Sequence, residues 1–146
     1  MCKNIRISNP PPKSKAVSEH MRGIGTKKTG VERRARRVLR IERLKFQGNV
    51  KNLPGTPDLV IPSLNLVIFV NGCFWHGCSR CYTSPKHNRK WWNNKIAGNR
   101  RRDRRVTRQL RTQGYSVVHL WEHDTDERMQ VRILGAINRR LSTGTQ

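Results

Sequence analysis

Three cysteines fall within nine residues of the chain, in the segment NGCFWHGCSRCY at residues 71–82. Cys73 and Cys78 have four residues between them, and Cys78 and Cys81 have two. Closely spaced cysteines wrap easily around a zinc ion, which takes four ligands in a tetrahedron. Three reduced cysteines in a core are the alternative, but the flanking His, Gly, Ser and Arg residues do not suit a core. The segment therefore predicts a structural zinc site that needs one further ligand.

The fourth ligand has to come from the remaining cysteine or from one of five histidines. Cys2 lies in a loose N-terminal tail and is a poor candidate. His119 lies inside a predicted buried strand. His123 lies just past the end of that strand, at the edge where the segment after Val70 emerges if the two strands are neighbours. His76 stays an alternative ligand because it lies between two cysteines. We predict that zinc is bound by Cys73, Cys78, Cys81 and His123.

The order of expected helices and strands indicates one α/β domain, an α/β sandwich with a central mixed sheet. We place this domain at residues 18–146 and a disordered basic tail at residues 1–17. The predicted strands are almost wholly apolar, which is typical of strands buried on both faces. They cover Asp58–Pro62, Leu66–Val70 and Tyr115–Trp121. Helices are expected at Thr29–Leu44, at Asn88–Gln113 with Gly98 as a candidate break and Gly114 as the cap, and at Asp126–Leu141.

The charge of the chain points to a polyanionic partner. Lys and Arg number 31 against 9 Asp and Glu, which gives a net charge of +22. Nucleic acid is the leading partner, and a merely basic protein of the ribosomal kind is the alternative. No apolar run approaches the ~20 residues that span a bilayer, and the N-terminus lacks the apolar region of a signal peptide. We therefore expect no membrane partner and a reducing, cytoplasmic location, where clustered cysteines are more often metal ligands than disulfides.

Asp58 is the acidic residue best placed for chemistry. It follows the turn sequence PGTP and opens a predicted strand, so it lies at a sheet edge that a metal and a phosphate can approach. A nuclease holds its divalent metal with hard oxygen ligands of this kind. The alternative role for Asp58 is that of a turn-capping residue. Glu32 has capping-box spacing from Thr29, which gives it a local structural role in a helix start.

The segments PGTPDLV and LVIFVNGCFWHGC, at residues 54–60 and 66–78, resemble the very short patch repair (Vsr) endonuclease family. The similarity runs from about residue 18 to residue 125 and includes SEHMRGI, VERRARRVL, RRRDRRVTRQL and GYSVVHLWEHD. The resemblance implies a restriction-endonuclease-like three-layer sandwich with a structural zinc. It also implies Mg²⁺-dependent nicking of one DNA strand beside a T:G mismatch, in mismatch repair. We expect a monomer that acts on double-stranded DNA at the nucleoid of a bacterial cytoplasm.

The family pattern implies roles for individual positions. Asp58 matches the central metal-binding aspartate, His76 the histidine that activates the attacking water, and Glu32 an acid that supports the site through water. Val70 and Asn71 stand where the family has a threonine and a histidine. The family threonine is implied to bind Mg²⁺ through its main-chain carbonyl, which Val70 retains. Asn71 can hydrogen-bond but cannot take up a proton near neutral pH, so we expect an effect on efficiency more than on reaction type.

Two groups of residues are candidates for DNA contact. The resemblance implies that Phe74 and Trp75 wedge into the DNA beside the mismatch, with Met21 entering from the other groove. A place in the core is the alternative for the two aromatic residues. A run of arginines is expected to grip phosphates, with a solvated helix face as its alternative. These arginines are Arg100, Arg101, Arg102, Arg104 and Arg105.

Two other functions stay open from the sequence. One is a restriction-like nuclease of a defence system or mobile element with another DNA target, which the departures at Val70 and Asn71 keep possible. The other is a non-catalytic, zinc-bearing nucleic-acid-binding protein. Asp58 and His76 argue against this binding protein, because binding alone needs neither residue.

Overall fold

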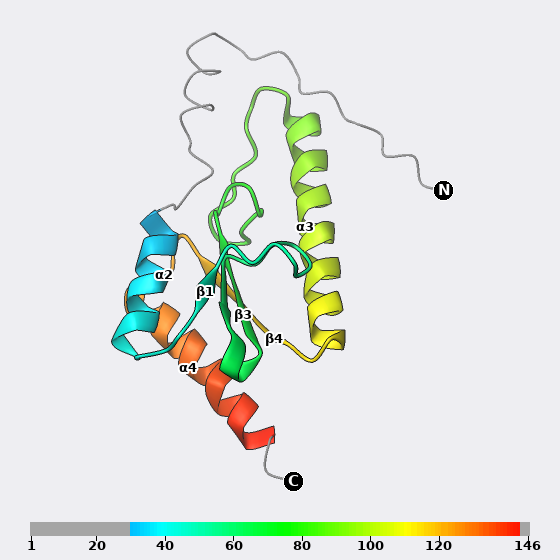
Figure 1. The fold of residues 1–146 in the computed structure, drawn as a ribbon. Helices are drawn as coiled ribbons and strands as arrows, with labels where there is room; N and C mark the ends of the chain where they lie inside the picture. The colour runs from blue at the N-terminus through cyan, green and yellow to red at the C-terminus, as the bar shows by residue number, and fades with distance from the viewer. Residues whose placement is uncertain (1–29, 144–146) are drawn as a thin grey trace.

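The computed structural model describes residues 30–143, which form a mixed sheet with helices on both faces (Figure 1). The predicted tail at residues 1–17, Met21 and the helix-capping Thr29 lie outside the described residues. The elements in chain order are α2 (Gly30–Ile41), β1 (Gln47–Gly48), β2 (Leu59–Ile61), the 3-10 helix η1 (Pro62–Leu64), β3 (Leu66–Asn71), α3 (Arg89–Thr112), β4 (Ser116–Trp121) and α4 (Asp126–Thr143).

The described sheet has four strands in the order β1-β2-β3-β4. The β1–β2 and β2–β3 pairs are antiparallel, whereas β3 and β4 are parallel, with Phe69 opposite His119 and Asn71 opposite Trp121. A parallel pair needs a long crossover connection, and α3 supplies it. The predicted mixed sheet is therefore confirmed.

Two apolar layers hold the helices on the sheet. Figure 1 shows α2 and α4 together on one side and α3 on the other. The core between α2, α4 and the sheet includes the fully buried Leu39, Ile68 and Ile133. The layer under α3 is smaller and centres on Val67 and Leu110. The sheet is covered on both faces, as the nearly continuous apolar strands predicted.

The element ends differ from the expected ones for local reasons. Helix α2 ends at Ile41 rather than Leu44, because Arg43 adopts a left-handed φ of 55° and the Leu44 N–H returns to the Leu39 carbonyl. Strand β2 stops before Pro62, which begins η1. Strand β4 is at the edge of the described sheet, so only Val118 and Leu120 are buried in a segment that was expected to be buried throughout.

Helix α3 runs unbroken through Gly98, so the candidate break at this glycine is wrong. A glycine inside a helix costs only about 1 kcal/mol relative to alanine, which the rest of a long helix can offset. The predicted cap at Gly114 is confirmed. Its φ is +89°, the Gly114 N–H donates to the Arg111 carbonyl, and the Tyr115 N–H donates to the Leu110 carbonyl. This hydrogen-bond pattern is typical of a glycine-terminated helix and turns the chain directly into β4.

Among residues 30–143, no helix is both long enough and apolar enough to cross a membrane.

Candidate active site

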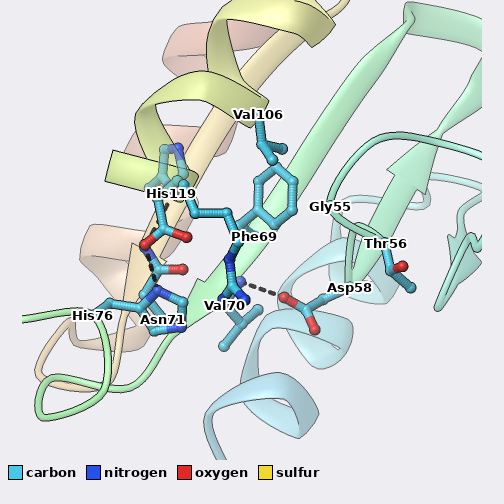
Figure 2. Close-up of a pocket in the computed structure, with 11 residues that line it drawn as sticks. Gly55, Thr56, Asp58, Phe69, Val70, Asn71, His76, Val106 and His119 are labelled. Carbon is cyan, nitrogen blue, oxygen red and sulfur yellow. Dashed lines mark hydrogen bonds and ion pairs between the residues drawn. The ribbon is translucent and has the colours of Figure 1, made fainter. Parts of the chain in front are cut away.

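An open cavity of about 420 Å³ lies at the carboxyl end of β3, between the loop that precedes β2 and the middle of α3 (Figure 2). Five of the predicted site residues line it: Asp58, Val70, Asn71, His76 and Arg102. They come from the residue just before β2, the end of β3, the loop after β3 and helix α3. The sheet register brings them together, because β2 and β3 are neighbours and α3 crosses over the same face.

Asp58 is a half-buried acid that lines this cavity. Its Oδ2 accepts a hydrogen bond of 2.7 Å from the Val70 N–H, drawn as a dashed line in Figure 2. Burial raises the pKa of Asp58, the Val70 N–H opposes this rise, and the negative charge of Glu32 adds to it. A carboxylate that is desolvated in this way gains stability from a nearby cation. The Asp58 carboxylate is a hard oxygen donor of the kind that suits a divalent cation such as Mg²⁺.

His76 is hydrogen-bonded across the cavity to Asp103 of α3. The distance from His76 Nδ1 to Asp103 Oδ2 is 2.7 Å, and both side chains are a quarter exposed. The carboxylate fixes the ring orientation and leaves Nε2 as the nitrogen available to a substrate. His76 is not in the cysteine cluster, so the structure separates it from the predicted zinc ligands. The sequence analysis missed Asp103, although it is the one acid within an arginine run at residues 100–105.

Asn71 and His119 form a second polar pair on the cavity wall. The Asn71 Nδ2 lies 3.1 Å from His119 Nδ1, and Thr107 Oγ1 lies 3.0 Å from His119 Nε2. The His119 ring stacks on Phe69, with ring centroids 5.4 Å apart. Burial lowers the pKa of His119. His119 was expected to be buried in a strand, but it is half-buried and lines the cavity. The sequence signal that could have indicated this position is a polar residue within an otherwise apolar strand.

Glu32 lies behind the cavity, on α2, and is buried. Its Oε1 accepts hydrogen bonds from the Arg36 guanidinium, one helical turn away, at 2.8 and 3.0 Å. Glu32 does not line the cavity, but its charge reaches Asp58 and raises the pKa of that carboxyl. The structure therefore places Glu32 within electrostatic range of the site, with Arg36 as its direct partner.

The four predicted zinc ligands come together in one cluster. His123 Nδ1 lies 3.2 Å from the Sγ of Cys73 and 3.5 Å from the Sγ atoms of Cys78 and Cys81. All four donor atoms lie within 4.8 Å of one another, and the three cysteines are free thiols. Three sulfurs and one imidazole nitrogen at this spacing can hold a metal ion. The cluster joins the loop after β3 to the segment after β4, and Cys73 N–H is held by the Glu122 carboxylate at 3.0 Å.

The aromatic residues of the same loop form a cluster with α3. Phe74 contacts the rings of Trp75 and Trp92 with centroid distances of 5.2 Å in both cases, and it also contacts Tyr82 at 5.8 Å. Phe74 is half-buried by these neighbours, whereas Trp75 is 37% exposed. The two residues therefore differ: Phe74 supports the loop, and Trp75 is the more exposed aromatic surface.

The arginines of the predicted run have different surroundings in the structure. Arg100 donates a hydrogen bond of 2.9 Å to the Gly77 carbonyl and lies over the Tyr82 ring, so it helps to hold the loop of His76. Arg102 lines the cavity. The other three arginines, within the described part of the chain, are exposed and have no hydrogen bond or ion pair from their side chains; they are Arg101, Arg104 and Arg105.

Comparison with known proteins identifies the family. Residues 12–83 match the family model described as DNA mismatch endonuclease Vsr. The chain is also 38% identical over 122 residues to the type II nicking enzyme V.XorIIP of Xanthomonas oryzae, over 83% of this chain and 85% of that protein. The chain belongs to the Vsr family of DNA mismatch endonucleases. The expected family is thereby confirmed.

Two further relatives support the assignment. The Vsr-family chain is 38% identical over 107 residues to the DNA mismatch endonuclease Vsr of Escherichia coli, over 72% of this chain and 68% of that protein. It is 34% identical over 101 residues to the type II nicking enzyme V.NmeAIP of Neisseria meningitidis, over 68% of this chain and 71% of that protein. Membership of the Vsr family makes this protein a DNA endonuclease, a hydrolase of phosphodiester bonds.

Proposed function

We propose that this Vsr-family endonuclease nicks one strand of duplex DNA beside a T:G mismatch, in an Mg²⁺-dependent reaction of mismatch repair. The observation that carries the proposal is a cavity lined by a desolvated aspartate, Asp58, and by a histidine, His76, that is hydrogen-bonded to a carboxylate. A metal-binding carboxylate and a positioned base are the two protein groups that phosphodiester hydrolysis needs.

Asp58 and the main-chain carbonyl of Val70 would hold the Mg²⁺. The ion, when bound, supplies charge relief at the phosphate and at the leaving oxygen. Glu32 supports the same corner from α2, where its charge already acts on Asp58. The fit rests on hard oxygen donors and on a carboxylate whose burial favours a cationic neighbour.

His76 is the base in this proposal. Its Nδ1 faces Asp103, so its Nε2 takes the proton of the attacking water as the water oxygen bonds to phosphorus. The bond from phosphorus to the leaving sugar oxygen then breaks. Asp103 keeps the ring in the tautomer with Nδ1 protonated and stabilises the imidazolium that forms. Arg102, which lines the cavity, would bind a phosphate oxygen through its guanidinium.

The cluster of three cysteines and His123 would hold a structural zinc ion, because thiolate and imidazole are ligands that zinc favours. The metal would fix the loop of His76 to the end of β4. A closed set of four protein ligands is typical of a structural site, so the zinc takes no part in the cutting step.

Recognition of the mismatch is assigned to the loop that also carries His76. Trp75 presents the more exposed ring, and Phe74 and Trp92 support it from behind. A wedge of this kind unstacks a base step, which costs a few kcal/mol and least where the pair is already weak. Met21, which the family pattern assigns to the other groove, lies outside the described residues.

We also propose that residues 18–146 form one restriction-endonuclease-like domain, active as a monomer in the bacterial cytoplasm. The covered mixed sheet and a candidate active-site cavity whose described walls all come from one chain support this organisation.

The test is a cutting assay. The purified protein is incubated with Mg²⁺ and a duplex that carries one T:G pair, labelled in turn on each strand, and the products are separated on a denaturing gel. A matched T:A duplex and a sample with EDTA are the controls. We expect one cut in one strand of the mismatched duplex and none in either control. Equal cutting of both duplexes would instead identify a nuclease with another DNA target.

A further inference from the structure

A row of three hydrogen-bonded side chains crosses the wall of the cavity from α3 to β3. Thr107 of α3 contacts His119 of β4 at 3.0 Å, and His119 contacts Asn71 of β3 at 3.1 Å. Figure 2 shows His119 and Asn71 on the side of the cavity that also carries His76. Neither Thr107 nor His119 has a role in the reaction as described above.

The hydrogen-bond partners define the protonation of the His119 ring. The Asn71 Nδ2 can only donate, so His119 Nδ1 must accept and carries no proton. The neutral ring then has its proton on Nε2, which donates to Thr107 Oγ1. Burial lowers the pKa of His119, which agrees with a neutral ring. Stacking on Phe69 holds the plane of the ring, so both of its nitrogens point to fixed partners.

The Asn71 amide oxygen is the terminal acceptor of the hydrogen-bonded row formed by Thr107, His119 and Asn71. Asn71 is 4% exposed, and within residues 30–143 no donor is bonded to its Oδ1. The same described residues contain no fully buried side-chain nitrogen or oxygen that lacks a partner. The Asn71 oxygen is therefore open to the cavity that Asn71 lines. An amide can turn by 180° with little change of shape, so its orientation depends on the partner of its nitrogen.

We propose that His119 is a positioning residue for strand cleavage: as the Nε2–H tautomer held by Thr107, it fixes the Asn71 amide so that the amide oxygen accepts a hydrogen bond from the attacking water. The water has two hydrogens. His76 takes one of them as the base, and the Asn71 oxygen binds the other, which directs an oxygen lone pair toward phosphorus. This inference rests on the proposed nicking reaction.

The first measurement needs no activity. The ring nitrogens of ¹⁵N-histidine-labelled, metal-loaded protein are observed by NMR, and the His119 signals are assigned from their loss in His119→Phe. We expect the neutral Nε2–H tautomer for His119. A proton on Nδ1 would mean that the ring donates to the Asn71 oxygen, which would overturn the proposal.

The second measurement compares two substitutions at Thr107. Thr107→Val keeps the shape of the side chain and removes the hydroxyl, whereas Thr107→Ser keeps the hydroxyl. We expect the single-turnover nicking rate of Thr107→Val on the T:G duplex to fall about three- to tenfold, as for one lost hydrogen bond, and the rate of Thr107→Ser to stay near wild type. The dissociation constant for DNA should be unchanged in both variants. A wild-type rate for Thr107→Val would contradict the proposal.

A double-mutant cycle shows whether Thr107 acts through Asn71. In an Asn71→Ala background, Thr107→Val should cause no further loss of rate, because the oxygen that it positions is gone. If the rate loss of the double variant equals the product of the two single losses, Thr107 does not act through Asn71 and the proposal is overturned. Failure of the proposed function and failure of the His119 proposal can be told apart. An absence of nicking by the wild type would refute the proposed function. The tautomer measured by NMR would still show how His119 and Asn71 are hydrogen-bonded.

Discussion

The two carboxylates of the cavity have different surroundings, and these surroundings suit the different roles that we propose for them. Asp58 is desolvated and is bonded to a main-chain N–H, whereas Asp103 faces the imidazole of His76. A buried carboxylate suits a cation, and a carboxylate next to histidine suits a base that must hold a positive charge in the transition state.

Asp103→Asn is expected to lower the nicking rate by about 10²- to 10⁴-fold, because the neutral amide neither stabilises the imidazolium nor selects its tautomer. Binding of the duplex should be unchanged, since the basic surface supplies most of the affinity. Single-turnover nicking and fluorescence anisotropy measure the two effects. Glu127→Gln, which removes an exposed acid on α4, is the control. A wild-type rate for Asp103→Asn would remove Asp103 from the mechanism.

Trp75→Ala is expected to weaken binding of the T:G duplex by about 1–3 kcal/mol, as for the loss of one base–aromatic stack, and to change binding of the matched duplex little. Titration of both duplexes with the variant measures this difference. The melting temperature is the companion measurement. A variant that unfolds would show that Trp75 belongs to the aromatic support of the loop and not to a surface for DNA.

The sequence could indicate which residues lie at the cavity where a distinctive motif surrounds them. Asp58 and His76 stand in short distinctive motifs, and both line the cavity. Asp103 and His119 have hydrogen-bond partners 27 and 48 residues away in the chain. Such pairings depend on the sheet register and on the crossover of α3, which no local pattern contains.

At the scale of elements, the cluster of three cysteines and His123 holds the long loop between β3 and α3, which has no helix or strand in this structure. We expect one zinc ion per chain in protein purified without chelator, measured by elemental analysis. Cys78→Ser should lower the zinc content and give a much lower melting temperature or insoluble protein, because a structural zinc contributes on the order of 10 kcal/mol to folding. Ser79→Ala, at the exposed neighbouring position, is the control. A folded, zinc-free wild type would refute this site.

Helices α2 and α4 are joined by ion pairs at one carboxylate. Asp126 at the start of α4 accepts a hydrogen bond of 2.7 Å from Arg34 and one of 2.8 Å from Arg37. The Arg34 hydrogen bond, with a smaller contribution from Arg37, lowers the pKa of Asp126 below its usual 3.8. A lowered pKa means that the pairs stabilise the fold above that value and that this contribution is lost as the pH falls below it.

Asp126→Asn is therefore expected to lower the free energy of unfolding at neutral pH. The difference in this free energy between variant and wild type should be smaller at about pH 3, because the wild-type ion pairs contribute less there. Urea titrations of both proteins at the two pH values measure this change. The effect should also decrease at high salt, since the pairs are open to solvent. A difference that is the same at both pH values would show that the amide disturbs the helix start in another way.

The three predicted strands and the three predicted α-helices are present, whereas their ends differ from the predicted ones. The apolar strands, the long basic helix and the cap at Gly114 are all present. The ends moved where one residue dictates the backbone, as Pro62 does after β2 and Arg43 does after α2. The short β1 was not expected, because two exposed residues without an apolar pattern give no strand signal.

For the molecule as a whole, the net charge of +22 makes DNA affinity depend on salt. The exposed Arg101 should contribute one phosphate contact at most. Arg101→Ala is expected to weaken matched and mismatched duplexes alike and to lower the slope of log affinity against log salt by about 0.9. Anisotropy titrations over a range of salt concentrations give the slope. An unchanged slope would place Arg101 outside the DNA contact.

Arg100→Ala is the informative comparison for that experiment. Arg100 is bonded to the Gly77 carbonyl and so holds the loop that carries His76. Its loss should lower the nicking rate on bound DNA, whereas Arg101→Ala should not. Equal behaviour of the two variants would mean that the run acts as one charged surface after all.

The parallel pairing of β3 with β4 also determines when the site can form during synthesis of the chain. Asp58 and His76 leave the ribosome well before His119 and His123, because α3 is translated between them. Until β4 has followed, β3 has no parallel neighbour, the cavity has no His119 wall and the metal cluster has no nitrogen donor. The incomplete chain already contains most of its arginines, so it can bind DNA through phosphate contacts. At that stage it has no complete active site and cannot cut the DNA.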